Sequence, residues 1–269
     1  MTDATNGSHV YDPSASHPFP TERLNAVLER IADDQEIQSL LASQNVNAVI
    51  RKQFNDHGPK HIEIVRNRAL RLYELLFDAG VEFNGAKDQG LDQADEPVIV
   101  ALAATLHDIG HVVHRDDHSY YSIPLASDIL DRLLPEFPWY DTASTVRMKA
   151  EILHAILCHH TAEEPLTLEA GIIRVADGLD MERGRSRIPY EQGDRGINAI
   201  SSQAIERVTL RPGEGVPVLV EIEMTSAAGV FQVDTLLKAK LADSGLEESI
   251  RIVAINSARG EQLIERIEL

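Results

Sequence analysis

The feature that most constrains this chain is an apolar run that ends at a histidine and an aspartate. Residues 98–106 read VIVALAATL, and His107 and Asp108 follow directly in the segment LHDIGH. Pro97 suits the first turn of a helix, so the run is expected to be helical. A helix that is apolar on all sides has to be buried, yet this one is far shorter than the ~20 residues that span a bilayer. Other elements must therefore surround it, and the two polar residues lie at the end of a buried helix.

The sequence on both sides of this run shows helical periodicity as far as Arg187. Leu24, Val27 and Ile31 are spaced as on one face of a helix, and the stripes that follow have the same period. The first expected helix begins near Thr21. Further helices are expected over Val46–Phe54, Pro59 to Ala79-Gly80, Pro97 to Leu106, His118–Leu134, Ala143–His160 and Leu166–Arg183.

The pattern changes after Arg187. Val216–Met224 alternates apolar and polar residues as a half-buried strand does, Gln232–Ala242 has helical character, and Ile250–Ile255 reads as a second strand. The predicted fold class is mainly α, a helical bundle with a small C-terminal α+β appendage of strand–helix–strand order. The expected division is a mobile tail over 1–20, a helical domain over 21–187, a linker over 188–204 and the appendage over 205–269.

Composition limits the kinds of partner. The formal net charge is −18, which disfavours extended binding to nucleic acid because such binding needs clustered cationic side chains. The single cysteine, Cys158, excludes an internal disulfide framework and fits a reducing compartment. The N-terminal segment has no basic stretch followed by an apolar core, so no secretory signal is visible. We expect a cytoplasmic protein that does not enter a membrane.

Histidines and aspartates on separate helices form the candidate chemical site. His61 lies near the start of one helix, His107 and Asp108 end the apolar helix, and Asp177 lies among apolar neighbours in a third. A buried ionised carboxylate has to be paired or coordinated. Imidazoles and carboxylates from several helices are a common way to hold a divalent metal ion in a bundle.

The sequence contains a histidine, a His-Asp pair and a distant aspartate, in that order. In this pattern the chain resembles the HD-domain superfamily of metal-dependent phosphohydrolases. The likeness covers roughly residues 55–187. It implies an all-helical core in which His61, His107, Asp108 and Asp177 bind one divalent cation. Asp180 lies one turn beyond Asp177, where it can orient a ligand or form a surface ion pair.

Some members of that superfamily bind a second metal ion through additional histidines. In this chain His118, His159 and His160 stand where those histidines are expected, and His111 replaces a lysine of the family pattern. The resemblance therefore implies one or two ions of Mn, Fe, Co, Ni or Mg. His57 and His114 lie beside turns and are expected to face solvent.

A second likeness is to the catalytic region of bacterial ribonuclease Y. That region shares the His-Asp-Ile-Gly segment, the His-His pair and an aspartate followed by an arginine-rich turn, which here contains Arg183, Arg185 and Arg187. The three arginines either bind a substrate phosphate or complement the dipole of a helix C-terminus. The anchor, coiled coil and RNA-binding module of the ribonuclease have no counterpart in this sequence.

The sequence thus predicts a metal-dependent phosphohydrolase that cleaves a phosphomonoester or phosphodiester of a small nucleotide-like substrate. Asp108, His111 and Arg183 are the expected catalytic residues. The alternatives are an RNA or oligonucleotide phosphodiesterase, an HD-type diiron oxygenase and a non-catalytic nucleotide-sensing module. We also expect a homodimer formed through the C-terminal domain, because a small sheet needs a cover over its apolar face. Packing against the helical domain is the other way to cover that face.

Overall fold

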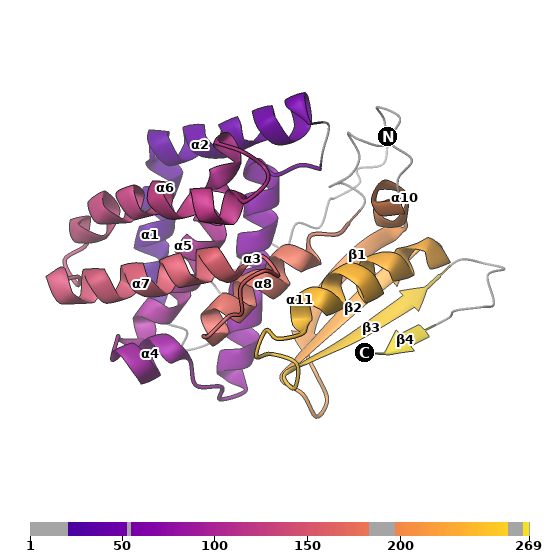
Figure 1. The fold of residues 1–269 in the computed structure, drawn as a ribbon. Helices are drawn as coiled ribbons and strands as arrows, with labels where there is room; N and C mark the ends of the chain where they lie inside the picture. Colours follow the sequence, from indigo (N-terminus) through magenta and orange to yellow (C-terminus); the bar gives the residue numbers. More distant parts are fainter. Residues whose placement is uncertain (1–20, 53–54, 183–196, 258–265, 269) are drawn as a thin grey trace, which may run out of the picture.

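The computed structural model of the chain describes residues 21–52, 55–182, 197–257 and 266–268. Its helical part lies on one side of the molecule and a four-stranded sheet on the other (Figure 1). The α-helices are α1 (Thr21–Asp33), α2 (Gln35–Asn45), α3 (Pro59–Asp78), α4 (Asn84–Gln89), α5 (Glu96–Leu106), α6 (His118–Leu133), α7 (Thr142–Cys158), α8 (Leu168–Leu179), α10 (Ile197–Gln203) and α11 (Lys238–Leu241). Short 3-10 or π-helical segments are η1 (Val46–Arg51), η2 (Gln93–Asp95), η3 (Ile109–Val112), η4 (Leu134–Glu136), η5 (Ala227–Gly229) and η6 (Gln232–Leu237).

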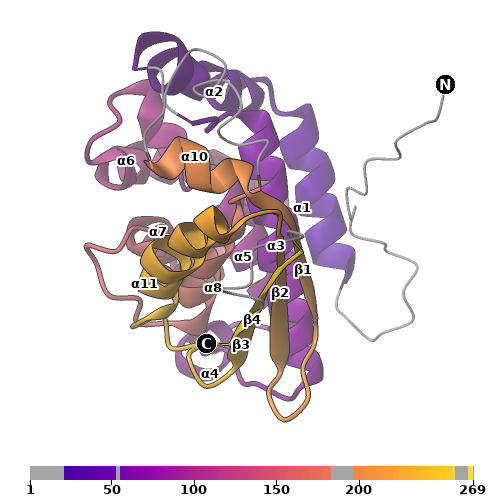
Figure 2. The same ribbon diagram turned by 90° about the vertical axis from the view of Figure 1, so that its right-hand side faces the viewer.

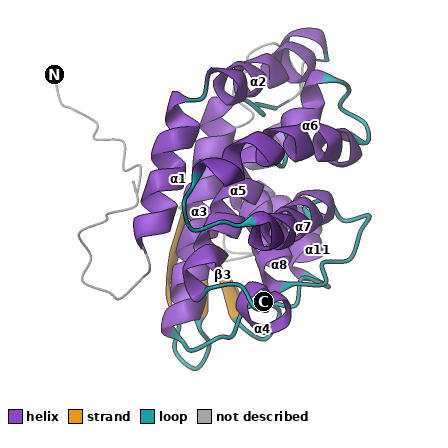
Figure 3. Cartoon of the chain, turned by 90° about the vertical axis from the view of Figure 1, so that its left-hand side faces the viewer, coloured by secondary structure: helices purple, strands orange, loops and turns teal. Residues whose placement is uncertain are grey.

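The apolar helix is the centre of the bundle. Every residue of α5 is buried, and α5 packs against α1, α3, α7 and α8 (Figure 3). The 3-10 segment η3 continues from its C-terminus and packs against α6. The prediction that other helices surround residues 98–106 is therefore confirmed, and the end of this helix lies in the interior of the protein.

The sheet has the order β1-β2-β3-β4, with strands β1 (Ile205–Pro212), β2 (Val218–Met224), β3 (Ile250–Asn256) and β4 (Arg266–Glu268). β1 and β2 form an antiparallel hairpin, β2 and β3 are parallel, and β3 and β4 are antiparallel. A parallel pair needs a crossover connection, which here runs through η5, η6 and α11. The strand–helix–strand order is confirmed, and β1 and β4 extend it at both edges.

The apolar face of the sheet is covered by the helical part of the same chain. Alternate residues of β2, beginning with Val218 and Val220, are fully buried. β1 and β2 pack against α3, and η6 and α11 pack against α8, so both parts share one hydrophobic core (Figure 2). This packing removes the reason given above for a dimer. A homodimer stays a prediction, and it would have to use a surface other than this apolar face.

Several boundaries differ from those expected. α8 ends at Leu179 rather than at the expected Arg183. The backbone turns at Asp180, whose N–H donates to the Asp177 carbonyl. Residues 197–203 of the expected linker form α10. The expected tail over 1–20 and the arginines Arg183, Arg185 and Arg187 lie outside the described residues. Within the described ranges, no helix has the length and apolarity that a membrane crossing requires.

Candidate metal centre

Asp108 lies at the centre of the candidate site, and its two carboxylate oxygens face different histidines. On one side, Asp108 Oδ2 lies 3.3 Å from His61 Nε2 and 3.5 Å from His107 Nε2. Asp177 Oδ1 completes this group, 3.4 Å from His61 Nε2 and 4.0 Å from His107 Nε2. Two imidazoles and two carboxylates from α3, α8 and the turn after α5 therefore face one point.

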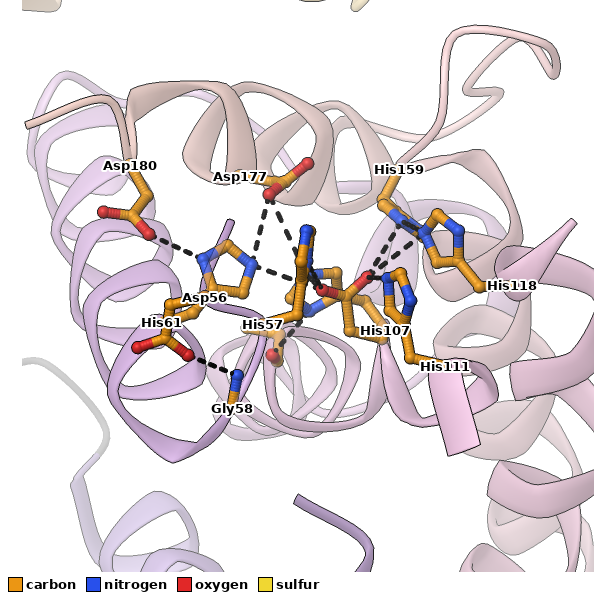
Figure 4. Close-up of polar contacts among 12 residues, drawn as sticks. Asp56, His57, Gly58, His61, His107, His111, His118, His159, Asp177 and Asp180 are labelled. Carbon is orange, nitrogen blue, oxygen red and sulfur yellow. Dashed lines mark hydrogen bonds and ion pairs between the residues drawn. The ribbon is translucent and has the colours of Figure 1, made fainter. Parts of the chain in front are cut away.

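Three further histidines surround the other oxygen. Asp108 Oδ1 lies 3.2 Å from His118 Nε2 and 3.6 Å from both His111 Nε2 and His159 Nε2. His118 Nε2 and His159 Nε2 are 3.0 Å apart. Figure 4 shows these side chains and those of the first group pointing toward a common centre. Asp108 is thus placed to bridge two positions, each with its own set of nitrogen and oxygen donors.

Gly110 brings the start of α6 against the turn that carries His107 and Asp108. A Cβ on Gly110 would lie 2.0 Å from the His118 carbonyl oxygen and 2.6 Å from the Ser122 nitrogen, so no larger residue fits. The Ser122 hydroxyl accepts a hydrogen bond from Gly110 N–H at 2.8 Å and donates one to the His107 carbonyl at 2.7 Å. This close approach places His118 beside Asp108.

Four of the histidines are oriented through their Nδ1 atoms. His107, His118 and His159 each donate Nδ1–H to a backbone carbonyl three residues earlier, at 2.9, 2.8 and 2.6 Å. His61 Nδ1 instead contacts Asp180 Oδ2 at 2.6 Å, so Asp180 orients a candidate ligand rather than forming a surface pair. A proton held on Nδ1 leaves the Nε2 lone pair toward the centre, as a metal-binding imidazole requires.

The electrostatics of the site favour neutral imidazoles around an ionised carboxylate. Burial lowers the pKa of His107, His111 and His159. Burial also disfavours charge on Asp108, but the imidazoles beside it, chiefly that of His107, hold its pKa well below the usual range. For His118, the contact with Asp108 outweighs burial and raises the pKa. The imidazoles of His107, His111 and His159 thus offer lone pairs, and Asp108 offers negative charge, to a cation.

The donor set fits a divalent metal ion. Ligand atoms about 2.0–2.1 Å from one ion are about 2.8–3.4 Å apart in octahedral or tetrahedral coordination, which is close to most of the separations above. His107 Nε2 and both ring nitrogens of His111 are buried and make no hydrogen bond to any residue that the structure describes. Such atoms are costly to bury unless something else binds them. Three His/Asp groups here have ligand atoms within 4.8 Å of one another.

The structure brings together most of the predicted ligands, namely His61, His107, Asp108, Asp177, His118 and His159. His160 is exposed, and the centroid of its ring lies 5.8 Å from that of His118 and 6.3 Å from that of His159. His111 is fully buried between the rings of His57 and His118, and its ring centroid lies 4.5 Å from the first and 4.1 Å from the second. Its imidazole thus lies inside the cluster of histidines around Asp108, and its predicted catalytic role stays a prediction.

Three residues of the site were not predicted from the sequence. His57 was expected to face solvent, but it is buried, and its Nδ1 lies 2.8 Å from Asp108 Oδ2. Its spacing of four residues from His61 was the signal available. Arg115 NH1 lies 3.3 Å from His57 Nε2, and Lys240 Nζ donates to Asp177 Oδ2 at 2.5 Å. Lys240 is far from the motifs along the sequence, so no local pattern pointed to it.

Comparisons with known proteins show the family of the chain. The model of the HD domain family matches residues 69–182, which include every candidate ligand except His57 and His61. An uncharacterized protein of Methanocaldococcus jannaschii is 37% identical over 228 residues, which cover 85% of this chain and 87% of that protein. With its helical core and its His-Asp centre, the chain belongs to the HD-domain superfamily of metal-dependent phosphohydrolases.

Proposed function

We propose that this protein hydrolyses a phosphate ester with one or two divalent metal ions held at Asp108. The first position would use His61, His107, Asp108 and Asp177, and the second would use Asp108, His111, His118 and His159. The substrate class that we propose is a small nucleotide-like phosphomonoester or phosphodiester, since the net charge of −18 disfavours a long polyanion. We also propose that it acts in the cytoplasm, as its single cysteine suggests.

The observation that carries this proposal is the pair of donor sets on the two oxygens of one carboxylate. Asp108 Oδ2 faces His61 and His107, whereas Asp108 Oδ1 faces His118 and the two histidines beside it. A divalent cation in such a site lowers the pKa of water toward neutrality and neutralises charge on a phosphoryl group.

The residues around the ligands hold this arrangement in place. Asp180 contacts His61 Nδ1 on the side of the ring away from Asp108. Arg68 holds Asp180 in turn, since its NH1 lies 3.9 Å from Asp180 Oδ1 and also donates to the Leu179 carbonyl. His57 Nδ1–H donates to the Asp108 carboxylate, and Arg115 NH1 lies close to His57 Nε2 on the other side of the ring. Arg115 is half-buried next to the centre and is a candidate to bind an incoming phosphate.

The test is an activity panel on protein stripped with a chelator and then reloaded with Mn, Co, Ni, Mg or Fe separately. The substrates are p-nitrophenyl phosphate, bis-p-nitrophenyl phosphate, nucleoside mono-, di- and triphosphates, cyclic nucleotides and a short RNA. We expect hydrolysis with at least one metal ion, and Asp108→Ala should lower it by at least about 1,000-fold. His114→Ala is the control, because His114 is an exposed histidine close to the site along the chain.

Three results would contradict the proposal. One is the absence of hydrolysis with every metal and ester, and another is full activity in Asp108→Ala. The third is an oxygen-dependent reaction that only the iron-loaded protein performs, with no ester cleavage. That result would favour the oxygenase alternative, which imidazole ligands also suit. Binding of nucleotides without turnover would instead favour a sensing module.

A further inference from the structure

Lys240 brings a positive charge from the C-terminal part of the chain to the metal centre. Its Nζ donates to Asp177 Oδ2 at 2.5 Å and to the His159 carbonyl at 3.0 Å. These contacts join α11 to α8 and to the residue that follows α7, across 63 and 81 residues of sequence. The Lys240 side chain is 19% exposed, so the ammonium group lies at the edge of the centre and is reached by solvent. An ammonium group has three N–H donors, and the described contacts occupy two of them.

The fold is shaped to accept this lysine. A Cβ on Gly178 would lie 2.8 Å from Lys240 Cδ and 3.4 Å from Lys240 Cβ, so a larger residue at 178 would force the lysine stem to shift along α8. Gly171 is two turns earlier on α8, and a Cβ there would lie 2.1 Å from the Ser244 carbonyl oxygen. The two glycines together let residues 240–244 pack closely on α8.

Lys238, on the same helix, lacks such a setting. Its side chain is 55% exposed, and its Nζ lies 3.4 Å from Asp234 Oδ1 one turn earlier. The position of Lys240 therefore depends on the packing of α11 against α8, and it is not a general property of the lysines of this segment. Lys238 serves as the matched control below.

Charge balance indicates what the ammonium group is for. Asp108 and Asp177 carry two negative charges, which one divalent cation neutralises and two such cations exceed. Lys240 then adds a further positive charge to a neutral or positive centre, and like charges in a partly buried site repel. An anion that enters the centre removes this repulsion, and a phosphate oxygen accepts a strong charge-assisted hydrogen bond.

We propose that Lys240, supplied by the C-terminal part, is a phosphate-binding residue of the metal centre. The inference rests on the proposed function and names the group that holds the phosphate of its substrate. The ammonium group would donate to a non-bridging oxygen while its contact with the His159 carbonyl keeps it in place. The C-terminal part would thereby complete the substrate site of the helical domain.

The test measures binding of inorganic phosphate to the full-length, manganese-loaded protein by isothermal titration calorimetry. We expect Lys240→Met to weaken phosphate binding by about 10- to 100-fold, as the loss of a charge-assisted hydrogen bond predicts. Lys238→Met should stay within about twofold of wild type. Lys240→Gln keeps a donor for Asp177 but removes the charge, so it should also weaken binding if Lys240→Met does not fold. Metal content and the melting temperature are measured for each variant.

A structural role for Lys240 gives a different result. If it only orients Asp177, Lys240→Met and Lys240→Gln will lower manganese content, yet at saturating manganese they will bind phosphate as wild type does. That outcome would overturn the inference, and so would wild-type protein that binds no phosphate at millimolar concentration. Phosphate binding that depends on Lys240 in a protein that cleaves no ester would refute the proposed function alone. Ester hydrolysis with unchanged KM and phosphate affinity in Lys240→Met would refute this inference alone.

Discussion

Glu96 gives a prediction about stability that the structure makes quantitative. Glu96 begins α5, is 2% exposed, and accepts a hydrogen bond from the Tyr73 hydroxyl at 2.8 Å. Burial raises the pKa of Glu96 to about 7, and the nearby carboxylate of Glu169 contributes to the shift. In the unfolded chain a glutamate has a pKa near its ordinary value of 4.5. The folded protein therefore binds a proton at Glu96 at pH values where the unfolded chain has lost it.

The sign and size of the effect follow from linkage. The contribution of Glu96 to the free energy of unfolding is fully present below its pKa in the unfolded chain. It is lost as pH rises through its pKa in the folded protein. Each pKa unit corresponds to about 1.4 kcal/mol, so between pH 5 and pH 8 this group lowers the free energy of unfolding by about 2.5 kcal/mol. Glu96→Gln removes the titration but keeps an oxygen that accepts from the Tyr73 hydroxyl.

The assay is urea denaturation of wild type and Glu96→Gln at pH 5 and pH 8. Other titrating groups, including the histidines of the metal centre, contribute equally to both proteins and cancel in the difference. We expect the variant to gain about 2.5 kcal/mol relative to wild type between the two pH values. A difference that does not change with pH would show that Glu96 is ionised in the folded protein and would refute the argument.

Three further predictions concern the metal centre. Asp180→Ala should lower metal affinity by about 10- to 100-fold in a competition assay with a chelator, because Asp180 orients His61. Asp180→Asn keeps an acceptor and should lose less affinity. Equal metal affinities of Asp180→Ala and wild type would contradict that role. Gly110→Ala should destabilise the protein by about 1–3 kcal/mol in denaturant titration, because its Cβ would overlap the start of α6, and a change within 0.5 kcal/mol would refute the packing argument. His160→Ala should leave the metal content unchanged while His118→Ala lowers it, because His160 is exposed and His118 faces Asp108; equal losses would show that His160 is a ligand.

Much of the helical part could be predicted because its signals are local. The apolar run before His107 specifies a buried helix from its own composition, and the motif residues lie at the helix ends that the structure shows. The ends of α8 were harder, because Thr167 caps its start and the backbone turns at Asp180 despite helix-favouring residues beyond. β1 was missed because most of its residues are exposed or half-buried, and an edge strand of that kind has no clear alternation.

The site could be predicted only in part, because several of its contacts depend on tertiary structure. His57 is turned inward by a segment in which the Asn45 side chain accepts from the His57 backbone N–H at 2.9 Å. A Cβ on Gly58 would lie 2.3 Å from Asn45 Nδ2, so this turn and α2 approach closely. Lys240 reaches Asp177 through the packing of α11 on α8, and nothing near Lys240 in the sequence indicates a metal centre. His159 and His160 are neighbours in the sequence, but α7 ends at Cys158, and of the two histidines that follow, His159 is buried and His160 is exposed.

The most direct test of the account is the number of metal ions that one chain binds. The protein is stripped with a chelator, reloaded with manganese, freed of excess metal and analysed by inductively coupled plasma mass spectrometry. If Asp108 bridges the two donor sets, wild type binds two ions per chain and His118→Ala binds about one, because the ligands on Asp108 Oδ2 remain complete. A ratio of one in fully loaded wild-type protein would contradict the bridging role of Asp108, and a ratio near zero would contradict the metal centre itself.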